Sequence, residues 1–475
     1  MKILLINPTY KQDFCKSARW AAKSRGRVQR HPDWMCMVTA VLEEAGHDCK
    51  FVDAQAQNMT EEETRKIIKK FQPDMGVIWT TTPSIYSDVN YGGIIKEEAG
   101  KDCLTVLVGA HPTALPKETI SIKPNSIDTI AMYEFDYTLR DLANGVEFKK
   151  CLGIAYKANG EIKINPMRPL IENLDELPFP AWHHIDPRCY HDAGKKYPFI
   201  TMIGGRGCSN VCSFCRERFT IEPGPYRKKS SKKLVDEIEY DFKLFPYLKE
   251  IMIEDDTFTA DVKQVLSFCK ELEERGLDIT WSCNARADIN DIDVLKKMKK
   301  TGCRMLCVGY EFGSQKLLDA VNKRVTLDSM RKFAKLTREA GLKVNGCFMI
   351  GAPGETKETA RQTIEFAKEL NPNTAQFSVM VPYPGTMFYK WAKENNFIIA
   401  KDWTEWVNED LEQATVISYP QMNKEEMEEF VDKGLREFYL RPSKIIELIS
   451  DTKSLSDIKR KLHGISAFFD YFSRH

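Results

Sequence analysis

The 475-residue sequence lacks an excess of charge of either sign and lacks any long apolar run. Lys and Arg number 69 and Asp and Glu number 68, which gives a formal net charge of +1. Balanced charge excludes a strong overall field for nucleic acid or an anionic membrane surface. No stretch of about 18 apolar residues is present to cross a bilayer. The start, MKILLINPTY, predicts a strand and not a signal peptide. We therefore expect a soluble, cytoplasmic protein without a nucleic-acid partner or an integral membrane segment.

The sequence also lacks the cysteine density of a disulfide-stabilised secreted domain. Its 14 cysteines are spread over a long chain, so reduced thiols are expected. Many stand singly in apolar segments, where a buried thiol behaves as a small hydrophobic side chain. Examples are Cys49, Cys103, Cys269, Cys283, Cys303, Cys307 and Cys347. Cys208, Cys212 and Cys215 differ because they lie close together.

Residues 1–145 alternate short aliphatic runs with amphipathic stretches. This rhythm predicts a doubly wound α/β domain, in which helices cover both faces of a parallel sheet. The expected strands are residues 2–7, 49–54, 75–80, 104–110 and 128–132, with helices at 35–46 and 60–71. Ligands bind such sheets beyond the carboxyl ends of the strands, so the loops after Ile6, Thr80 and Val108 are candidate binding loops.

Residues 146–195 lack periodicity and are rich in proline, which predicts a linker. Six β/α units follow in residues 196–398. Their expected strands are 198–205, 249–255, 278–283, 304–311, 343–351 and 375–384. Six units are too few for a closed eight-stranded barrel, so a partial barrel is predicted. Residues 399–475 are predicted to be a helical extension, with 425–440 as its best amphipathic segment.

The segment GGRGCSNVCSFC places Cys208, Cys212 and Cys215 at C-x3-C-x2-C spacing just after a predicted strand. A structural zinc site requires four ligands, and the closest further candidate, His191, lies upstream across that strand. An iron–sulfur cluster accepts three cysteines, because the fourth iron can stay open to a substrate or cofactor. The spacing therefore predicts a cluster with an open iron.

This motif, with Phe214 directly before the last cysteine, resembles that of the radical SAM superfamily, and the domain order resembles its cobalamin-binding branch. The resemblance implies that the three cysteines hold a [4Fe–4S] cluster whose open iron chelates S-adenosylmethionine (SAM). An external one-electron reductant such as flavodoxin or ferredoxin would drive SAM cleavage to methionine and a 5′-deoxyadenosyl radical. Residues 1–145 would then be a Rossmann-like cobalamin-binding domain and residues 196–398 the radical SAM barrel.

The resemblance also implies cofactor-binding positions at the carboxyl ends of the predicted strands. Those implied around SAM are Phe214, Glu254, Asp255, Asn284, Arg286, Glu311, Ser314 and Gly351. Those implied for cobalamin are Thr80, Thr81, Thr82, Ser84, Gly109 and His111. The D-x-H-x-x-G motif of many cobalamin-binding domains is missing, so no protein histidine is expected on cobalt.

Two segments depart from the family pattern. Residues 131–142 keep only Glu134 of the usual G-E-G-E segment. The loop between Tyr10 and Trp34 is basic and carries Arg19, Lys23, Arg25, Arg27 and Arg30. We interpret this charge run as a solvated surface, with an acidic or phosphorylated substrate or a protein chain as the alternative ligand.

The leading functional hypothesis is an enzyme, a C-methyltransferase of the class B radical SAM type that methylates an unactivated carbon. It would convert two SAM molecules into S-adenosylhomocysteine and 5′-deoxyadenosine, and its substrate would be a small molecule or a peptide or protein side chain. The alternative is a cyclase or carbon-skeleton-modifying enzyme that resembles the anaerobic porphyrin cyclase or hopanoid-associated relatives. A further alternative keeps the fold without cobalamin. A sensor is disfavoured, because a receptor has no use for an open iron.

Overall fold

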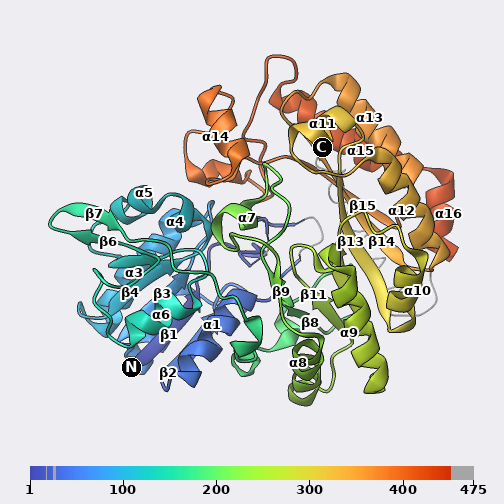
Figure 1. Cartoon of the computed structure of the whole chain (residues 1–475). Coiled ribbons are helices and arrows are strands. Elements are labelled where there is room, and N and C mark those ends of the chain that lie inside the picture. The colour runs from blue at the N-terminus through green and yellow to red at the C-terminus, as the bar shows by residue number, and fades with distance from the viewer. Residues whose placement is uncertain (18, 25–27, 451–475) are drawn as a thin grey trace.

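The computed structural model describes residues 1–17, 19–24 and 28–450, which form two α/β lobes joined by a connector (Figure 1). The first lobe holds a seven-stranded sheet of order β2-β1-β3-β4-β5-β6-β7. Its strands are β1 (Lys2–Asn7), β2 (Asp48–Asp53), β3 (Met75–Trp79), β4 (Leu104–Val108), β5 (Thr129–Ala131), β6 (Ile154–Ala158) and β7 (Glu161–Ile164). The first five pair in parallel, in the order of a doubly wound sheet.

Helices cover both faces of this sheet, as nearly continuous apolar strands predict. Ile3 and Leu5 of β1 belong to one buried cluster, whereas Leu4 and Ile6 point the opposite way into another. The helices are α1 (Asp33–Glu44), α2 (Glu61–Phe71), α3 (Ile85–Ala99), α4 (Ala110–Ala114), α5 (Pro116–Ser121) and α6 (Asp136–Ala143). The predicted doubly wound sheet is confirmed.

A β-hairpin extends the first sheet within the segment interpreted as a linker. The strands β6 and β7 pair antiparallel through Asn159 and Gly160, whose φ angles of 53° and 81° are both left-handed. An Asn-Gly pair favours this two-residue turn, and between IAYKA and EIKI it is a hairpin signal. The linker interpretation is therefore wrong for residues 154–164.

The rest of the connector lies against α1. It contains the short helices η1 (Leu174–Glu176), η2 (Trp182–His184) and η3 (Pro187–Cys189). The Ala181 amide donates to the Cys36 carbonyl at 2.9 Å, and His184 Nε2 lies 2.8 Å from Glu43 Oε1. The connector is thus anchored on the first lobe before it enters the second.

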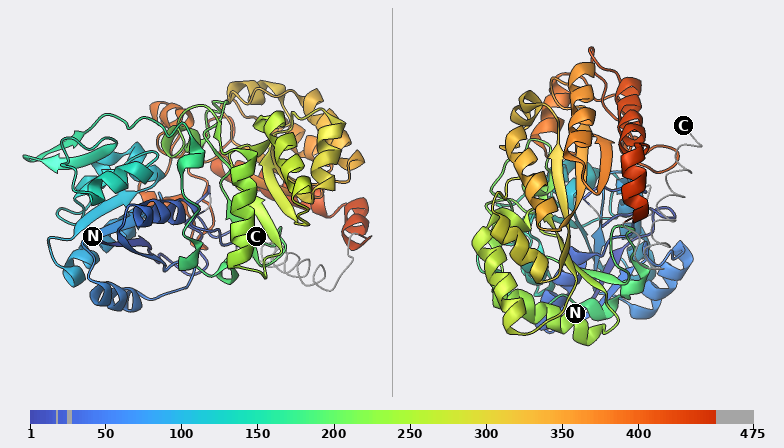
Figure 2. Two further views of the ribbon diagram at one scale, coloured as in Figure 1. Left: turned by 60° about the horizontal axis from the view of Figure 1, so that its bottom comes forward. Right: turned by 90° about the vertical axis from the view of Figure 1, so that its right-hand side faces the viewer.

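The second lobe, called the barrel lobe below, contains a six-stranded parallel sheet of order β8-β11-β12-β13-β14-β15. Its strands are β8 (Phe199–Met202), β11 (Glu250–Ile253), β12 (Trp281–Ala285), β13 (Cys303–Glu311), β14 (Lys343–Ile350) and β15 (Thr374–Val379). The predicted partial barrel is confirmed. The left view of Figure 2 shows the first lobe, blue to cyan, beside the barrel lobe, green to orange, and in the right view the barrel lobe lies in front.

Most of the barrel strands are followed by helices, as β/α units require. These are α7 (Arg216–Thr220), α8 (Ser231–Leu244), η4 (Phe258–Ala260), α9 (Val262–Glu274), α10 (Ile292–Lys300), α11 (Gln315–Ala320), α12 (Leu327–Glu339), α13 (Lys357–Leu370) and α14 (Met387–Glu394). A two-stranded ribbon of β9 (Gly205–Arg206) and β10 (Arg227–Lys228) flanks the first strand.

The C-terminal segment is helical in part. Its elements are η5 (Trp403–Trp406), α15 (Lys424–Tyr439) and α16 (Pro442–Ser450). The helix α15 packs on β15, where the Tyr439 hydroxyl bonds both the amide and the carbonyl of Ala375 at 2.9 Å. Residues 407–422 are irregular, so the helical prediction is wrong there, and residues 451–475 lie outside the described part.

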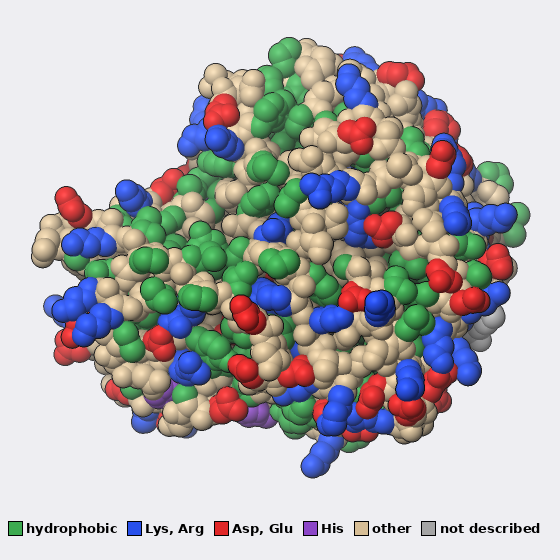
Figure 3. Space-filling model, viewed as in Figure 1, with side chains coloured by type: hydrophobic (Ala, Val, Ile, Leu, Met, Phe, Trp, Pro, Cys, Tyr) green, Lys and Arg blue, Asp and Glu red, His purple; other side chains and the backbone are tan. Residues whose placement is uncertain are grey.

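Charges of both signs are interspersed over the face shown in Figure 3, in agreement with the balanced composition. Within the described residues, no helix is both long enough and apolar enough to cross a bilayer.

Candidate functional site

Three thiols lie on one loop of the barrel lobe, between β9 and α7. Cys208 and Cys212 are buried and Cys215 is half-buried, and none of them forms a disulfide. Backbone bonds fix the loop: the Cys208 amide donates to the Gly224 carbonyl (3.3 Å) and the Cys215 amide to the Cys212 carbonyl (3.1 Å). The predicted ligands therefore share one ordered loop.

The donor set fits an iron–sulfur cluster better than a single ion. Among the described residues, the one group of three ligand atoms within 4.8 Å of one another belongs to Glu43, His183 and His184, where η2 meets α1. The three thiols do not form such a group among the described residues, and they lack the fourth ligand of a structural zinc site. An iron–sulfur cluster accepts three cysteines, which leaves one iron open.

Two cationic side chains approach Cys212. Burial raises the pKa of this thiol, whereas Lys323 and Arg286 act to lower it. Lys323 Nζ donates to Glu311 Oε1 at 2.6 Å, and Arg286 Nη2 donates to the Lys323 carbonyl at 2.7 Å. The structure therefore brings Arg286 and Glu311 together beside the cysteine loop, and their contact with SAM stays a prediction. The sequence analysis missed Lys323, because its position between α11 and α12 carries no motif.

The acidic residues after β11 have different roles. Asp255 accepts hydrogen bonds from the Gly204 amide (2.6 Å) and the Tyr226 hydroxyl (2.9 Å), and burial raises its pKa to about 6. Both carboxyl oxygens thus accept hydrogen bonds inside the protein, and Asp255 holds the turn at Gly204. Its contact with SAM stays a prediction. The neighbouring Asp256 pairs with Arg19 of the first loop.

The basic loop between Tyr10 and Trp34 reaches the barrel lobe. Arg19 Nη2 donates to the Glu254 carbonyl at 2.8 Å. Arg30 Nη2 lies 3.0 Å from Asp192 Oδ2, and its Nη1 lies 3.8 Å from Glu254 Oε2. The solvated-surface interpretation is therefore wrong for Arg19 and Arg30, whose charges meet acids at the mouth of the barrel.

The other basic residues of this loop differ in placement. Lys16 is fully buried, and its Nζ lies 2.5 Å from Asp88 Oδ1 in the first lobe. Lys23 lies 3.9 Å from Asp13 at the surface. Arg25 and Arg27 lie outside the described residues.

Three further residues predicted to contact SAM lie in the barrel lobe. Asn284 Nδ2 donates to the Asp255 carbonyl at 2.9 Å, and Ser314 is the buried residue that precedes α11. Phe214 is half-buried against the barrel core. All three lie near strand ends, and their contact with SAM stays a prediction.

The backbone conformation and the packing at position 351 both favour glycine. Its φ is +100°, and an added Cβ would lie 3.2–3.3 Å from Met427, Ile417 and Val379. Its carbonyl accepts from the Tyr419 hydroxyl at 2.6 Å. The glycine thus admits the C-terminal segment, and its close approach to the adenine of SAM stays a prediction.

The hydroxyl groups after β3 are engaged within the first lobe. Thr80 Oγ1 donates to the Val108 carbonyl (2.8 Å), and Thr81 Oγ1 lies 2.6 Å from Ser84 Oγ, which donates to Asp88. An added Cβ on Gly109 would lie 2.6 Å from the Thr80 carbonyl oxygen, so this glycine permits the strand ends to pack closely. Thr80, Thr81 and Ser84 thus shape this edge through hydrogen bonds inside the lobe, and their contact with cobalamin stays a prediction.

His111 remains available at this edge. Its side chain is buried, Nδ1 lies 3.4 Å from Thr82 Oγ1, and Nε2 has no hydrogen-bond partner among the described residues. Burial lowers its pKa to about 3, so the imidazole is neutral. The Trp403 ring packs edge-on against it with centroids 4.9 Å apart. The C-terminal segment thus covers the carboxyl end of β4.

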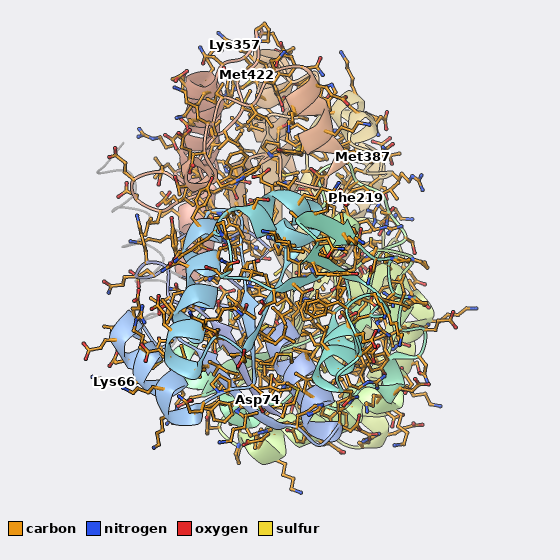
Figure 4. All side chains as sticks on the ribbon, turned by 90° about the vertical axis from the view of Figure 1, so that its left-hand side faces the viewer. Lys66, Asp74, Phe219, Lys357, Met387 and Met422 are labelled. Carbon is orange, nitrogen blue, oxygen red and sulfur yellow. The ribbon has the colours of Figure 1, made fainter. Side chains whose placement is uncertain are left out.

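The carboxyl ends of the strands in the first lobe lie on the side of that lobe that faces the cysteine loop of the barrel lobe. The helix α4, which follows β4, contacts α7, which follows the cysteine loop. Between them, an added Cβ on Gly385 would lie 2.9 Å from Thr220 and 3.1 Å from Ala114. Figure 4 labels Phe219 of α7 and Met387 of α14 on this flank, with Lys66 and Asp74 at the far end of the first lobe. One shared region therefore lies between the cysteine loop and the first sheet.

Comparison with known proteins agrees with this arrangement. Residues 202–367 match the family model of the radical SAM superfamily, and residues 25–143 match that of the B12 binding domain. An uncharacterized methyltransferase of Pyrococcus horikoshii is 32% identical over 426 residues, which cover 88% of this chain and 90% of the relative. The chain belongs to the radical SAM superfamily, in its B12-binding branch. It is an enzyme that uses a [4Fe–4S] cluster, SAM and cobalamin.

Other relatives of this radical SAM enzyme differ in their named reactions. The anaerobic magnesium-protoporphyrin IX monomethyl ester cyclase of Rubrivivax gelatinosus is 30% identical over 81% of this chain and 68% of its own length. Among solved structures, the radical SAM methyltransferase TsrM from Kitasatospora setae has a TM-score of 0.70 at 14% identity, covering 99% of both chains. The cobalamin-dependent radical enzyme OxsB has a TM-score of 0.64 at 18% identity, covering 96% of this chain and 63% of its own. At these identities the likeness shows a shared fold.

Proposed function

We propose that this radical SAM enzyme is a C-methyltransferase that acts on an unactivated carbon and consumes two SAM molecules per turnover. The observation that carries the proposal is the contact between α4 and α7, which faces the cobalamin edge toward the cysteine loop. A methyl donor and a radical source must reach the same substrate carbon, and proximity of this kind is worth many orders of magnitude in rate.

Each group of residues has a distinct task in this proposal. Cys208, Cys212 and Cys215 would hold the cluster, which supplies the electron that cleaves SAM. Glu254 and Glu311 would accept hydrogen bonds from the SAM ammonium, and Lys323 positions the Glu311 carboxylate. Charge-assisted bonds of this kind are the strong ones at a buried site.

The first lobe would hold cobalamin at the carboxyl ends of β3 and β4, where the cofactor supplies a methyl carrier. Thr82 and His111 keep polar atoms there, and Trp403 covers them. Such cover excludes water, which favours radical chemistry by preventing side reactions.

The proposed reaction draws one electron from an external reductant such as flavodoxin or ferredoxin, which suits a cytoplasmic enzyme. Its substrate would be a small molecule or a peptide or protein side chain. No step in it uses nucleic acid.

The test is the ratio of the two SAM products in anaerobic turnover. Methyl transfer to an unactivated carbon yields S-adenosylhomocysteine and 5′-deoxyadenosine in equal amounts, with a product heavier by one methyl group. Mass spectrometry of the product and liquid chromatography of both nucleosides give the answer. Deoxyadenosine without S-adenosylhomocysteine would contradict the proposal.

A ring-forming reaction is the second candidate, and the 30% identity to the Rubrivivax cyclase favours it. Its product would be lighter by two hydrogens or isomeric with the substrate. The same measurement therefore separates the two reactions.

A further inference from the structure

The inner face of the barrel is lined by side chains that alternate with the buried core. Along β14, Val344, Phe348 and Ile350 are buried, while the intervening side chains are half-buried. In strand register, these inner positions form rows across the sheet. One row contains Asn284, Cys307, Asn345 and Thr374, and the next contains Gly309, Cys347 and Gln376.

A buried lysine from the connector enters this interior. Lys195 is only 2% exposed, and its Nζ lies 3.0 Å from Met252 Sδ, 3.2 Å from Ser282 Oγ and 3.7 Å from Cys307 Sγ. These three neighbours lie on the adjacent strands β11, β12 and β13, which places the ammonium inside the barrel. All three are uncharged, and no carboxylate of the described residues lies within ion-pair distance of Nζ. A buried cation without a paired anion is costly.

An arginine from the first lobe enters beside it. Arg30 lies near the Cys347 thiol, whose pKa is raised by burial and which Arg30 acts to lower. Its Nε and Nη1 atoms are buried and have no hydrogen-bond partner, whereas Nη2 is bonded to Asp192. The guanidinium therefore has buried N–H donors without a hydrogen-bond partner, which can bind an oxyanion.

The carboxylates near Arg30 and Lys195 already have partners or are assigned to another ligand. Asp192 is held by Arg30 and by the Gly194 amide at 2.7 Å. Burial raises the pKa of Asp192, but Arg30 and Lys195 outweigh it, so the net shift is downward. Glu254, 3.8 Å from Arg30, is beyond hydrogen-bond distance and is assigned to SAM by the proposed function.

A second buried carboxylate, that of Glu250, is paired with a different cation, Arg304. Glu250 lies at the foot of β11 and bonds Arg304 through both oxygens at 2.9–3.1 Å. It also accepts from Ser282 at 2.6 Å. Among the described residues, Lys195 therefore has no carboxylate within ion-pair distance, and Arg30 keeps buried N–H groups without a hydrogen-bond partner.

We propose that Arg30 and Lys195 form the recognition site for an oxyanion group of the substrate, a carboxylate or a phosphate, inside the barrel beside Cys307. The inference rests on the proposed function, since it places the substrate below the SAM residues Glu254 and Glu311. Neighbouring side chains suit a polar molecule, because Gln376 and Ser378 on β15 are exposed and Cys307 and Cys347 are half-buried. The reacting carbon would lie nearer the strand ends, above this anchor.

The test uses Cys307 as a reporter in the full chain with its cluster assembled under anaerobic conditions. Iodoacetate and iodoacetamide have similar size and attack the same thiolate, but only iodoacetate is an anion. Peptide mass spectrometry gives the ratio of their rates at each cysteine, and changes in thiol acidity cancel in this ratio. Cys49 and Cys189 are matched controls, since both are half-buried and have acidic neighbours.

The ratio of iodoacetate to iodoacetamide should be about threefold or more higher at Cys307 than at the two control thiols. Arg30→Gln and Lys195→Met should each lower it toward the control value, and Arg30→Lys should keep it. Arg65→Gln, at an exposed ion-pair cluster on α2, should leave it unchanged. Acetate and inorganic phosphate as competitors distinguish the two oxyanions, because the better match slows carboxymethylation of Cys307 more.

A ratio at Cys307 no higher than at Cys49 and Cys189, or one insensitive to Arg30→Gln, would overturn the inference. Absence of any reaction at Cys307 would also overturn it, because a small anion must reach the site. The alkylation ratio does not depend on methyl transfer. Failure of the two-product test with a high ratio at Cys307 would therefore reject the proposed function alone.

Discussion

Arg206 of the barrel lobe and Asp136 of the first lobe form a bidentate ion pair in which both side chains are completely buried. The Nη1–Oδ2 and Nη2–Oδ1 distances are 2.8 and 3.0 Å. The guanidinium also lies 4.5 Å from the Trp34 ring. Because Arg206 stands two residues before Cys208, the pair ties the cysteine loop to the start of α6 in the other lobe.

Asp136→Asn should strongly destabilise the protein. The substitution leaves the Arg206 charge buried without its anion, which costs about 3–5 kcal/mol in comparable buried pairs. Urea denaturation followed by circular dichroism measures the change. Glu369→Gln, at the exposed pair with Arg331, is the matched control and should cost at most about 1 kcal/mol. Equal effects of the two substitutions would contradict the role of Arg206 in joining the lobes.

Replacing Cys208, Cys212 and Cys215 by Ala should abolish the iron–sulfur cluster. The three thiols share one loop, and the described residues bring no further cysteine into it. Iron and sulfide assays with electron paramagnetic resonance of the reduced, reconstituted protein measure the loss. Cys103→Ala, a buried single thiol in the first lobe, should retain the full signal. A complete cluster in the triple variant would reject the ligand assignment.

The sequence predicts the strands well because each carries a local pattern, and it fails where partners come from afar. The aliphatic runs of β1 and β3 are visible without any contact. In contrast, nothing local shows that Arg19 and Arg30 meet acids more than 160 residues away. A charge run looks the same whether solvent or another lobe balances it.

The site residues also divide into those with a local sequence signal and those whose partners are distant in the sequence. The spacing of Cys208 and Cys212 is a chemical requirement and can be read from the chain, whereas nothing local shows that Tyr226 donates a hydrogen bond to Asp255. The turn residues Asn159 and Gly160 are a local signal that the linker interpretation overlooked. Distant pairing limits the prediction of the ion pairs and of the hydrogen bonds around the site.

Asp33 should make stability depend on pH. Burial raises its pKa from 3.8 to about 7, although Thr201 Oγ1 donates to it at 2.5 Å. The folded state thus keeps a proton that the unfolded state releases above pH 3.8, so stability falls as pH rises from about 4 to 7. The full change is on the order of 4 kcal/mol.

Asp33→Asn should remove this dependence. The urea denaturation midpoints of the wild type and the variant are compared at pH 5 and pH 8. The wild-type midpoint should fall relative to the variant midpoint at the higher pH, so that the two values approach each other or cross. Asp328→Asn, at a side chain that is 92% exposed, should show no such difference. A wild-type-minus-variant difference that is constant with pH would show that Asp33 is ionised in the folded protein.

Bound cob(II)alamin should show no nitrogen splitting from a protein histidine. The Trp403 ring covers the neutral His111 imidazole at 4.9 Å, and no D-x-H-x-x-G motif supplies another histidine. Electron paramagnetic resonance of the reduced cofactor measures the splitting. His47→Ala, at the far end of the first lobe, is the control. Nitrogen splitting that disappears in His111→Ala would prove that this histidine binds cobalt.

Glu311 and Lys323 should contribute to SAM affinity as a unit. Glu311 adopts a φ of 66° and accepts from Lys323 Nζ at 2.6 Å, and both side chains are about nine-tenths buried. Glu311→Gln removes the proposed acceptor of the SAM ammonium, and Lys323→Met leaves that acceptor without its positioning partner. Each substitution should weaken SAM binding by about tenfold, which corresponds to about 1.4 kcal/mol.

The double variant should bind SAM about as weakly as either single variant, because residues in one hydrogen-bonded pair are not additive. Anaerobic equilibrium dialysis of SAM on the cluster-loaded protein measures all four affinities. Arg331→Gln, which breaks an exposed ion pair on α12, should bind SAM like the wild type. Fully additive losses would mean that Lys323 acts on SAM independently of Glu311, and unchanged affinity in Glu311→Gln would remove Glu311 from the site altogether.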